Sequence, residues 1–274
     1  MSSHLFSPTS PFWRVNRESL MVLSGPRALL LELAHPLVAA GVAQHSNYQG
    51  DPLGRLYRTI RMMTDLNFGD GSRAKRAAQR VQRSHTPVSG QLTTDVGPYL
   101  AGTHYQAHDP LLKLWVLATL VDSIWAVHDL ILRPLSLTEK QAYYVDTQLL
   151  GHAFGIPPEM MPPTYDDFLN YIDSMLTSDL LTVGDDARHI VHALFHAPGL
   201  GPMIRAASFV SIGLLPERLR AAYGFEWDTG RERWLRRWAA LSRHAWPRVP
   251  SLLRAHPQAV WAEWQMILDI QNQA

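Results

Sequence analysis

The sequence contains no cysteine. Disulfide bonds, thiolate metal sites, iron–sulfur clusters and cysteine nucleophiles are therefore excluded. Three motifs that depend on glycine are also missing, because the sequence has no G-x-S-x-G, no P-loop and no G-x-G-x-x-G. Nothing thus indicates a serine hydrolase, a nucleotide-binding loop or a dinucleotide-binding fold. Chemistry in this protein has to use histidine, carboxylate, hydroxyl or phenol side chains, or a cofactor.

The sequence also has little excess charge and no long uninterrupted apolar run. Its 25 Lys and Arg residues nearly balance its 24 Asp and Glu residues. Nucleic acid binding needs concentrated positive charge, so no nucleic-acid partner is expected. The longest apolar run, Leu111 to Val127, contains Lys113 and Asp122 and is short for a membrane span. It predicts a buried central helix and no transmembrane segment, and it leaves peripheral contact with a membrane open.

The remaining composition indicates a globular helical protein. With 274 residues, 46% of them hydrophobic, the chain is long enough to bury a substantial core. Apolar residues do not alternate with period two, and no βαβ pattern is present. The sequence predicts an all-α fold, with a flexible N-terminus over residues 1–11 and a single helical domain over residues 12–274. The first eleven residues lack a basic region followed by an apolar run, so we expect a cytoplasmic location.

Capping residues and prolines mark where the helices begin and end. The first expected helices are Phe12–Leu23, Arg27–Ala34 and, after a kink at Pro36, Leu37–Ala43. The next two are a helix that begins at Asp51-Pro52 and ends near Phe68, and a basic helix with Ser72 as its N-cap. The last three are Leu111–Leu130 after the cap Asp109-Pro110, a helix from the capping box Ser136/Glu139 to Phe154, and Tyr165–Thr177 after the cap Thr164. Later segments alternate helical patterns with glycine and proline breaks.

One helix face combines cations with apolar side chains. Arg55, Arg58 and Thr59 lie at i, i+3 and i+4, so they share a face. Met62 and Met63 follow one turn later. A face of this kind occurs on solvated helices. It also occurs in pockets where fixed cations meet an anionic group beside an apolar wall, and the pattern leaves both interpretations open.

Several histidines are candidates for functional roles. His85 ends the basic helix and is followed by Thr86-Pro87, so the proline fixes its imidazole at a helix end. The arginines and lysine of that helix predict a solvated face, with contact to the anionic groups of a cofactor or to an anionic surface as the alternative. His35, at the Pro36 kink, and His45 lie on apolar helices, where a hydrogen-bonded structural histidine is commoner than a ligand.

The spacing of His189, His192 and His196 places them on one helix face, which is one arrangement for a metal site. The glutamate expected of a metallohydrolase helix is missing, so this interpretation ranks below a structural one.

Eight short segments between residues 29 and 171 carry a family resemblance. They are Leu29–Pro36, Gly41–Ser46, Arg55-x-x-Arg58-Thr59, His85-x-x-Val88-x-Gly90, Asp109-Pro110, Trp115–Thr119, Gly155-Ile156-Pro157 and Met161-Pro162. In order and spacing they resemble the rubber oxygenases (latex clearing proteins) and the MpaB-type oxygenases. No motif matches after about Asp179.

The resemblance implies an all-helical domain that encloses a b-type haem, with His85 as the axial iron ligand. Arg55 and Thr59 would be the catalytic polar residues on the distal side, and Arg58, Met62 and His45 would line the cofactor site. The rubber oxygenases have a lysine, able to ligate iron, where this chain has Arg58. A guanidinium stays protonated and has no free lone pair, so we expect a distal position that is open or closed by water.

The function implied is that of a haem-dependent oxygenase acting on a small apolar substrate with dioxygen or a peroxide. Three alternatives remain open. The same pocket could serve a non-catalytic carrier of haem or of a lipophile. The late histidines could form a helical metallohydrolase, or the protein could be a helical scaffold without a cofactor.

Overall fold

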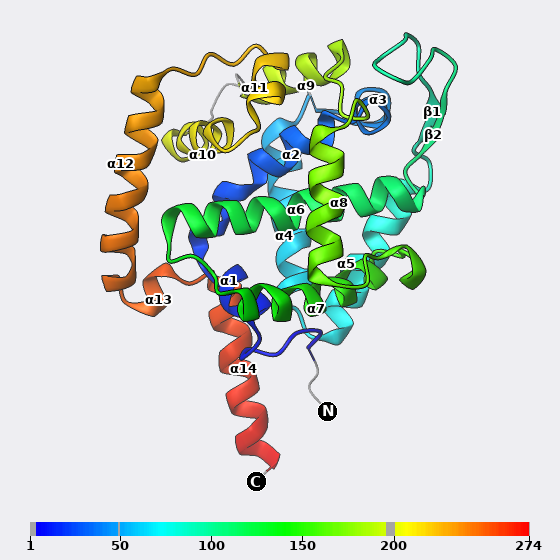
Figure 1. Ribbon diagram of the computed structural model, residues 1–274. Coiled ribbons are helices and arrows are strands. Elements are labelled where there is room, and N and C mark those ends of the chain that lie inside the picture. The colour runs from blue at the N-terminus through cyan, green and yellow to red at the C-terminus, as the bar shows by residue number, and fades with distance from the viewer. Residues whose placement is uncertain (1–3, 49, 196–200, 274) are drawn as a thin grey trace.

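The apolar helix α6 (Pro110–Ile131) runs through the middle of the molecule, with other helices around it (Figure 1). The computed structural model describes residues 4–48, 50–195 and 201–273, apart from the side chains of residues 52, 53, 55, 56, 203 and 269–273. Asp109 caps α6 by accepting a hydrogen bond from the Leu111 N–H, and Pro110 occupies the first helical position. The predicted buried central helix is confirmed.

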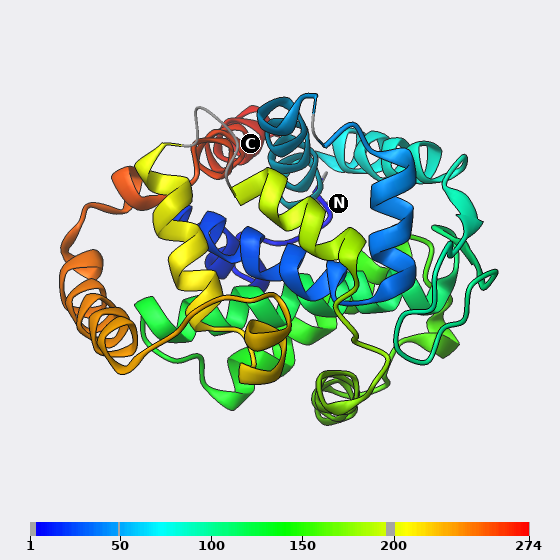
Figure 2. The ribbon, with the colours of Figure 1, turned by 90° about the horizontal axis from the view of Figure 1, so that it is seen from above.

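The elements around α6 are almost all helical, which confirms the all-α class (Figures 1 and 2). In chain order they are α1 (Pro11–Asn16), the 3₁₀ helix η1 (Ser19–Ser24), α2 (Gly25–Leu33), α3 (Pro36–His45), α4 (Pro52–Phe68), α5 (Gly71–His85), β1 (Ser89–Gln91), β2 (His104–Gln106), α6, α7 (Leu137–Ala153), η2 (Pro158–Met160), α8 (Tyr165–Thr177), α9 (Asp185–Phe195), α10 (Pro202–Gly213), α11 (Glu217–Ala222), α12 (Thr229–Ala245), η3 (Trp246–Arg248), α13 (Ser251–Arg254) and α14 (Pro257–Gln273).

The short hairpin of β1 and β2 was not predicted. The two strands pair antiparallel, with Gly90 opposite Tyr105, and each has only three residues. A strand this short gives no alternating pattern that could be recognised in the sequence.

The N-terminal caps that were expected from the sequence are confirmed at three further helices. Asp51 caps α4, Ser136 and Glu139 form a capping box on α7, and Thr164 caps α8. At α5 the prediction was wrong, because Asp70 is the cap. Its carboxylate accepts hydrogen bonds from the Arg73 N–H and from the Ser72 hydroxyl.

The first predicted helix, Phe12–Leu23, was also wrong. α1 ends at Asn16, and the separate 3₁₀ helix η1 begins at Ser19. Between them, Glu18 forms an isolated antiparallel bridge with Ala255, and its backbone is extended. A residue that pairs in this way cannot keep helical dihedral angles, so the helix is interrupted.

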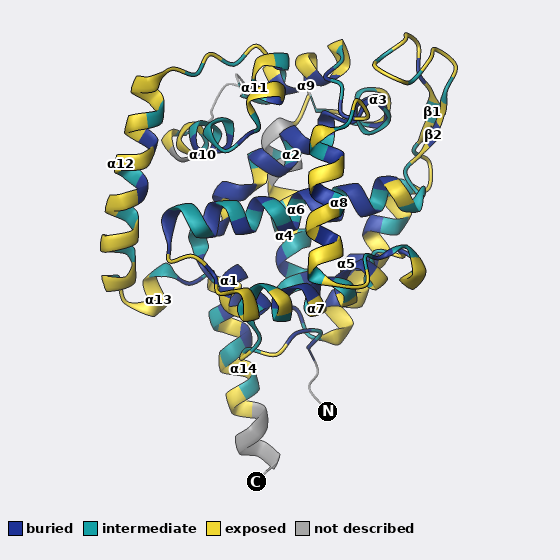
Figure 3. Ribbon diagram, viewed as in Figure 1, coloured by how far each residue is buried: buried dark blue, intermediate teal, exposed yellow. Residues whose placement is uncertain are grey.

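The core extends into the segment before α1, which composition predicts to be flexible. Phe6 is buried and stacks on Phe12, with ring centroids 4.1 Å apart. Burial is greatest on α2, α6 and the inner faces of the surrounding helices (Figure 3). Two of the segments that carry the family resemblance meet in this core, where the Trp115 indole of α6 donates a hydrogen bond to the Leu31 carbonyl of α2 at 3.2 Å.

By length and composition alone, α6 could cross a membrane, and it is the one such helix in the described part of the chain. The helical segment of η1 and α2 passes the same test if it is joined to α3 and the two are counted as one span. The chain bends by 105° between α2 and α3, however. More than half of the apolar window of α6 is buried by the protein, as expected for a core helix.

A buried cation joins α2 to α6. Arg27, only 5% exposed, donates to the Asp122 carboxylate at 2.7 Å and to the Ser123 hydroxyl at 2.9 Å. Its Nε donates to the Leu214 carbonyl after α10 at 3.1 Å. A buried guanidinium needs such partners because desolvation of an unpaired charge is costly.

We therefore expect Arg27→Ala to lower the free energy of unfolding by about 3 kcal/mol, because it leaves Asp122 without its cation beside the core. Arg236→Ala is the matched control. Arg236 pairs with Glu232 at 2.7 Å on the exposed face of α12, and its loss should cost less than about 0.5 kcal/mol. Urea unfolding followed by circular dichroism measures both, and equal losses would contradict the role given to Arg27.

Candidate functional site

α4 and α5 pack against each other through an apolar inner face. Leu66 of α4 and Ala77 and Ala78 of α5 are buried there, and Met62 and Met63 pack against them. Phe154 at the end of α7 joins the same cluster. Met62, which the sequence predicts as a cofactor contact, therefore lies in an apolar environment between these helices.

His85 is the last residue of α5 and continues its buried stripe, four residues after Val81. Burial, followed by the nearby His108 and Lys113, lowers the pKa of its imidazole below the ordinary 6.5. The ring is thus neutral at pH 7. Neither ring nitrogen makes a hydrogen bond to any residue that the structure describes. A neutral imidazole with an uncommitted nitrogen is the form that binds a metal.

His108 and Lys113 lie near enough to His85 to lower the pKa of its imidazole, and the sequence did not predict this proximity. Lys113 comes from the first turns of α6, and burial lowers the pKa of its ammonium group. It forms no ion pair with the residues described here. The His108 Nε2 lies 3.4 Å from the Thr86 hydroxyl. One signal could have pointed to Lys113: a single lysine in an otherwise apolar helix has to reach solvent, a partner or a pocket.

The segment after His85 is attached to α3. The Val88 N–H donates to the His85 carbonyl, and the His45 Nε2 lies 3.0 Å from the Ser89 carbonyl oxygen. His45 itself is exposed at the end of α3. The structure therefore brings His45 and His85 to the same end of β1, with His45 in a contact that positions the strand.

Gly90 allows a close approach at this joint between α3 and the hairpin. The Tyr105 hydroxyl donates to the Gln44 side-chain oxygen at 2.8 Å directly against the Gly90 backbone. A Cβ at Gly90 would lie 2.7 Å from that hydroxyl and 2.8 Å from that oxygen. Any other residue would push the two side chains away, so the glycine keeps β1 close to α3.

The polar face predicted on α4 is only partly described. Arg58 is two-thirds exposed and pairs with Asp51 at 2.8 Å, an interaction that holds the pKa of that carboxyl below its usual value. Thr59 is exposed. The side chain of Arg55 lies outside the described part of the structure, so its direction is not placed. The structure thus brings Met62 and His85 onto packed helices and leaves Arg58 at the surface.

His35 has the structural role that the sequence favoured. Its Nδ1 accepts a hydrogen bond from the Leu37 N–H and caps α3, so in the neutral ring the proton is on Nε2, which lies 3.1 Å from the Tyr99 hydroxyl. Burial lowers the pKa of His35 to about 4. His35 therefore fastens the bend between α2 and α3 to the loop of the hairpin.

Of the three late histidines, the two that the structure describes do not belong to a cluster that could hold a metal ion. His189 and His192 are exposed on α9, and His196 lies outside the described residues. Among the residues that are described, no group of three or more His, Cys, Asp or Glu side chains is arranged to hold a metal ion. A haem needs only one protein ligand to its iron, so this absence does not bear on His85.

Residues 13–244 match the family described as "ER-bound oxygenase mpaB/B'/Rubber oxygenase, catalytic domain". Two similar proteins are the uncharacterized protein Mb2261 of Mycobacterium bovis and the uncharacterized protein Rv2237 of Mycobacterium tuberculosis. Each is 26% identical over 214 residues, which cover 75% of this chain and 80% of the relative. No solved structure matches the chain significantly. The family match extends well beyond the motif segments, into the region after Asp179.

The lowered pKa of His35 predicts a pH dependence of folding. Above pH 6.5 the ring is neutral in both states, and as the pH falls towards 4 only the unfolded chain gains the proton. The folded protein should therefore lose about 3 kcal/mol through this histidine over that interval. His35→Asn keeps a capping oxygen but does not titrate, and urea unfolding at a series of pH values should show a shallower decline for it. Parallel curves would exclude this role.

Proposed function

The chain belongs to the family of ER-bound oxygenase mpaB/B′ and rubber oxygenase catalytic domains, and from this premise we propose that it is a haem b-dependent oxygenase of a small apolar substrate. Oxygenase activity is what the family as a whole has in common. The observation that supports the haem is the state of His85, a half-buried imidazole that is neutral at pH 7 and has no hydrogen-bond partner among the described residues.

The residues around His85 fit this cofactor. The imidazole would bind the iron, and Lys113, a partly buried cation without an ion pair in the described chain, is available for a carboxylate of the porphyrin. Met62, Met63 and Phe154 pack against the apolar face between α4 and α5 that leads to His85, and they would supply apolar contacts for the macrocycle. When bound, the haem would supply the activation of dioxygen or peroxide that no amino-acid side chain provides.

The chemistry and the exposure of Arg58 support a cofactor site that stays accessible to a small oxidant. Its guanidinium has no free lone pair, and its ion pair with Asp51 holds it at the surface. Arg58 therefore offers no ligand that would compete with a small oxidant. The residues of the chain have three tasks in this proposal: His85 holds the cofactor, the apolar side chains exclude water and accept the substrate, and polar groups of α4 stabilise developing charge.

We expect His85→Ala to abolish stoichiometric haem binding and to leave the far-ultraviolet circular dichroism unchanged, because it removes a ligand at a helix end and little packing. The Soret absorbance and the iron content of the purified protein measure this.

His45→Ala and His128→Ala are the matched comparisons. His45 is exposed. His128 lies on α6 about 22 Å along the helix axis from Lys113, the residue near His85, at a rise of 1.5 Å per residue. Both variants should keep their haem. Normal haem content in His85→Ala, or no haem in the parent protein, would refute the assignment.

Arg55→Ala and Thr59→Ala should each keep the haem and lose about a hundredfold in oxidation rate, which corresponds to a barrier increase of about 3 kcal/mol. The reason is that a cation and a hydroxyl donor stabilise developing negative charge most strongly where water is excluded. For Thr59, which is exposed in the structure, this exclusion would come from the bound cofactor and substrate.

Haem content and turnover of generic oxygenase and peroxygenase probes distinguish the possible results. If Arg55 instead binds a haem carboxylate, its loss will reduce haem retention and leave turnover per haem unchanged. If the parent protein binds haem but oxidises no probe, a carrier of haem or of a lipophile is the better assignment.

A further inference from the structure

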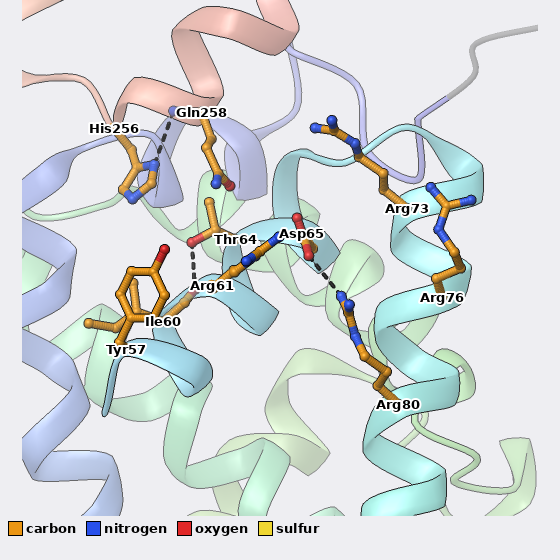
Figure 4. A pocket seen from close by; sticks show the side chains of 10 residues that line it. All are labelled: Tyr57, Ile60, Arg61, Thr64, Asp65, Arg73, Arg76, Arg80, His256 and Gln258. Carbon is orange, nitrogen blue, oxygen red and sulfur yellow. Dashed lines mark hydrogen bonds and ion pairs between the residues drawn. The ribbon is translucent and has the colours of Figure 1, made fainter. Parts of the chain in front are cut away.

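A basic groove lies where α4, α5 and the beginning of α14 meet (Figure 4). It encloses about 600 Å³, which is within the range of small-molecule sites. Ile60 and the buried Thr64 of α4 line it, and the Thr64 hydroxyl donates to the Ile60 carbonyl at 2.6 Å. Tyr57, 64% exposed, stands at its edge.

The groove has a large excess of positive charge. Four guanidinium groups line it, from Arg61, Arg73, Arg76 and Arg80, against the one carboxylate of Asp65. That carboxylate is already paired with Arg80 at 2.9 Å, and Figure 4 shows Arg80 reaching across to it from α5. The other three arginines make no ion pair with any residue described in the structure.

The wall formed by α14 supplies hydrogen-bond donors without further charge. His256 Nδ1 accepts from the Gln258 N–H at 3.3 Å, so in the neutral ring Nε2 carries the proton and can donate. The ring is held in place by stacking on Phe68, with centroids 5.9 Å apart. Gln258 extends from the same turn to line the groove (Figure 4).

This groove is separate from the His85 site. On α4, Tyr57, Ile60, Arg61 and Thr64 line the groove, whereas Met62, Met63 and Leu66 pack into the apolar cluster against α5. The same division holds on α5, where the groove arginines alternate with the buried stripe that leads to His85. A ligand of the groove would thus lie on the opposite side of this helix pair from the proposed cofactor.

We propose that the groove binds a phosphate group carrying at least two negative charges, held between Arg61 of α4 and Arg73 and Arg76 of α5. Guanidinium forks match phosphate oxygens in pairs. Three arginines on two helices that form no ion pair with a described residue favour a multiply charged anion over a single carboxylate, although the nearby Asp70 carboxylate offsets part of the charge of Arg73. The phosphate could belong to a soluble compound or to a lipid headgroup. The second source is included because Trp261 and Trp264 are exposed further along α14, the helix that forms one wall.

The test uses the purified 274-residue chain as isolated. Calorimetric titration with sodium pyrophosphate measures binding of a soluble ligand. Sedimentation with phosphatidylcholine vesicles, with and without phosphatidic acid, measures binding of a headgroup. Arg61→Gln and Arg76→Gln should each weaken binding about tenfold, and the double variant on the order of a hundredfold, because each removes charge-assisted hydrogen bonds. Raising the salt concentration should weaken binding further.

Two further variants keep the test specific. The double variant Arg83→Gln/Arg237→Gln removes the same charge from exposed positions on α5 and α12 outside the groove, and it should change the affinity less than about twofold. Asp65→Asn removes the carboxylate that lines the groove and frees Arg80, so it should tighten binding severalfold. Misfolding cannot produce tighter binding. All variants should keep the haem content of the parent protein. A failure of phosphate binding can therefore be distinguished from a failure of the haem assignment.

The outcomes identify the source of the phosphate. Binding of pyrophosphate alone indicates a soluble ligand, binding of phosphatidic acid vesicles alone indicates a headgroup, and binding of both shows that the phosphate group itself is recognised. The proposal is overturned if neither binds, or if the control double variant weakens binding as much as Arg61→Gln/Arg76→Gln does.

Discussion

Because α6 is apolar around most of its circumference, it has to be covered on nearly every side, and the rest of the fold follows from this requirement. α2 covers it along the motif segments, where the Trp115 indole donates to the Leu31 carbonyl. Arg27 adds a polar interaction that fixes the position of α2 along the axis of α6. Its partners Asp122 and Ser123 are consecutive residues on a single turn of that helix. Apolar packing alone tolerates small shifts, whereas a buried guanidinium has to find its partners.

The α4–α5 pair has two faces with opposite properties, and this division organises the candidate functions. The inner face is apolar and leads to His85 at the end of α5. The outer face carries guanidinium groups around a groove that α14 closes on one side. A helix pair can serve two sites in this way because residues three and four positions apart share a face, while their immediate neighbours point elsewhere.

Identical side chains have different roles according to what surrounds them. His35 is buried, and both of its ring nitrogens lie at hydrogen-bonding distance from partners, so it acts as a cap at a bend. His45 positions a strand through the Ser89 carbonyl. His85 is partly buried near two other basic groups and keeps its ring nitrogens uncommitted among the described residues. Burial favours the neutral imidazole in His35 and His85, but only His85 keeps a lone pair available to a metal.

The helical class, the helix starts at Asp51, Asp109, Ser136 and Thr164, and the bend before Pro36 could all be predicted from the amino-acid sequence. Each depends on groups within a few residues of one another. The resemblance pointed to His85 because its motif is also local. Features that depend on distant segments became visible in the folded chain. Glu18 ends the first helix by pairing with Ala255, Lys113 of α6 comes to lie beside His85, and His256 closes a groove of arginines from α4 and α5. These contacts join residues far apart in the chain, so no local spacing or periodicity could contain them.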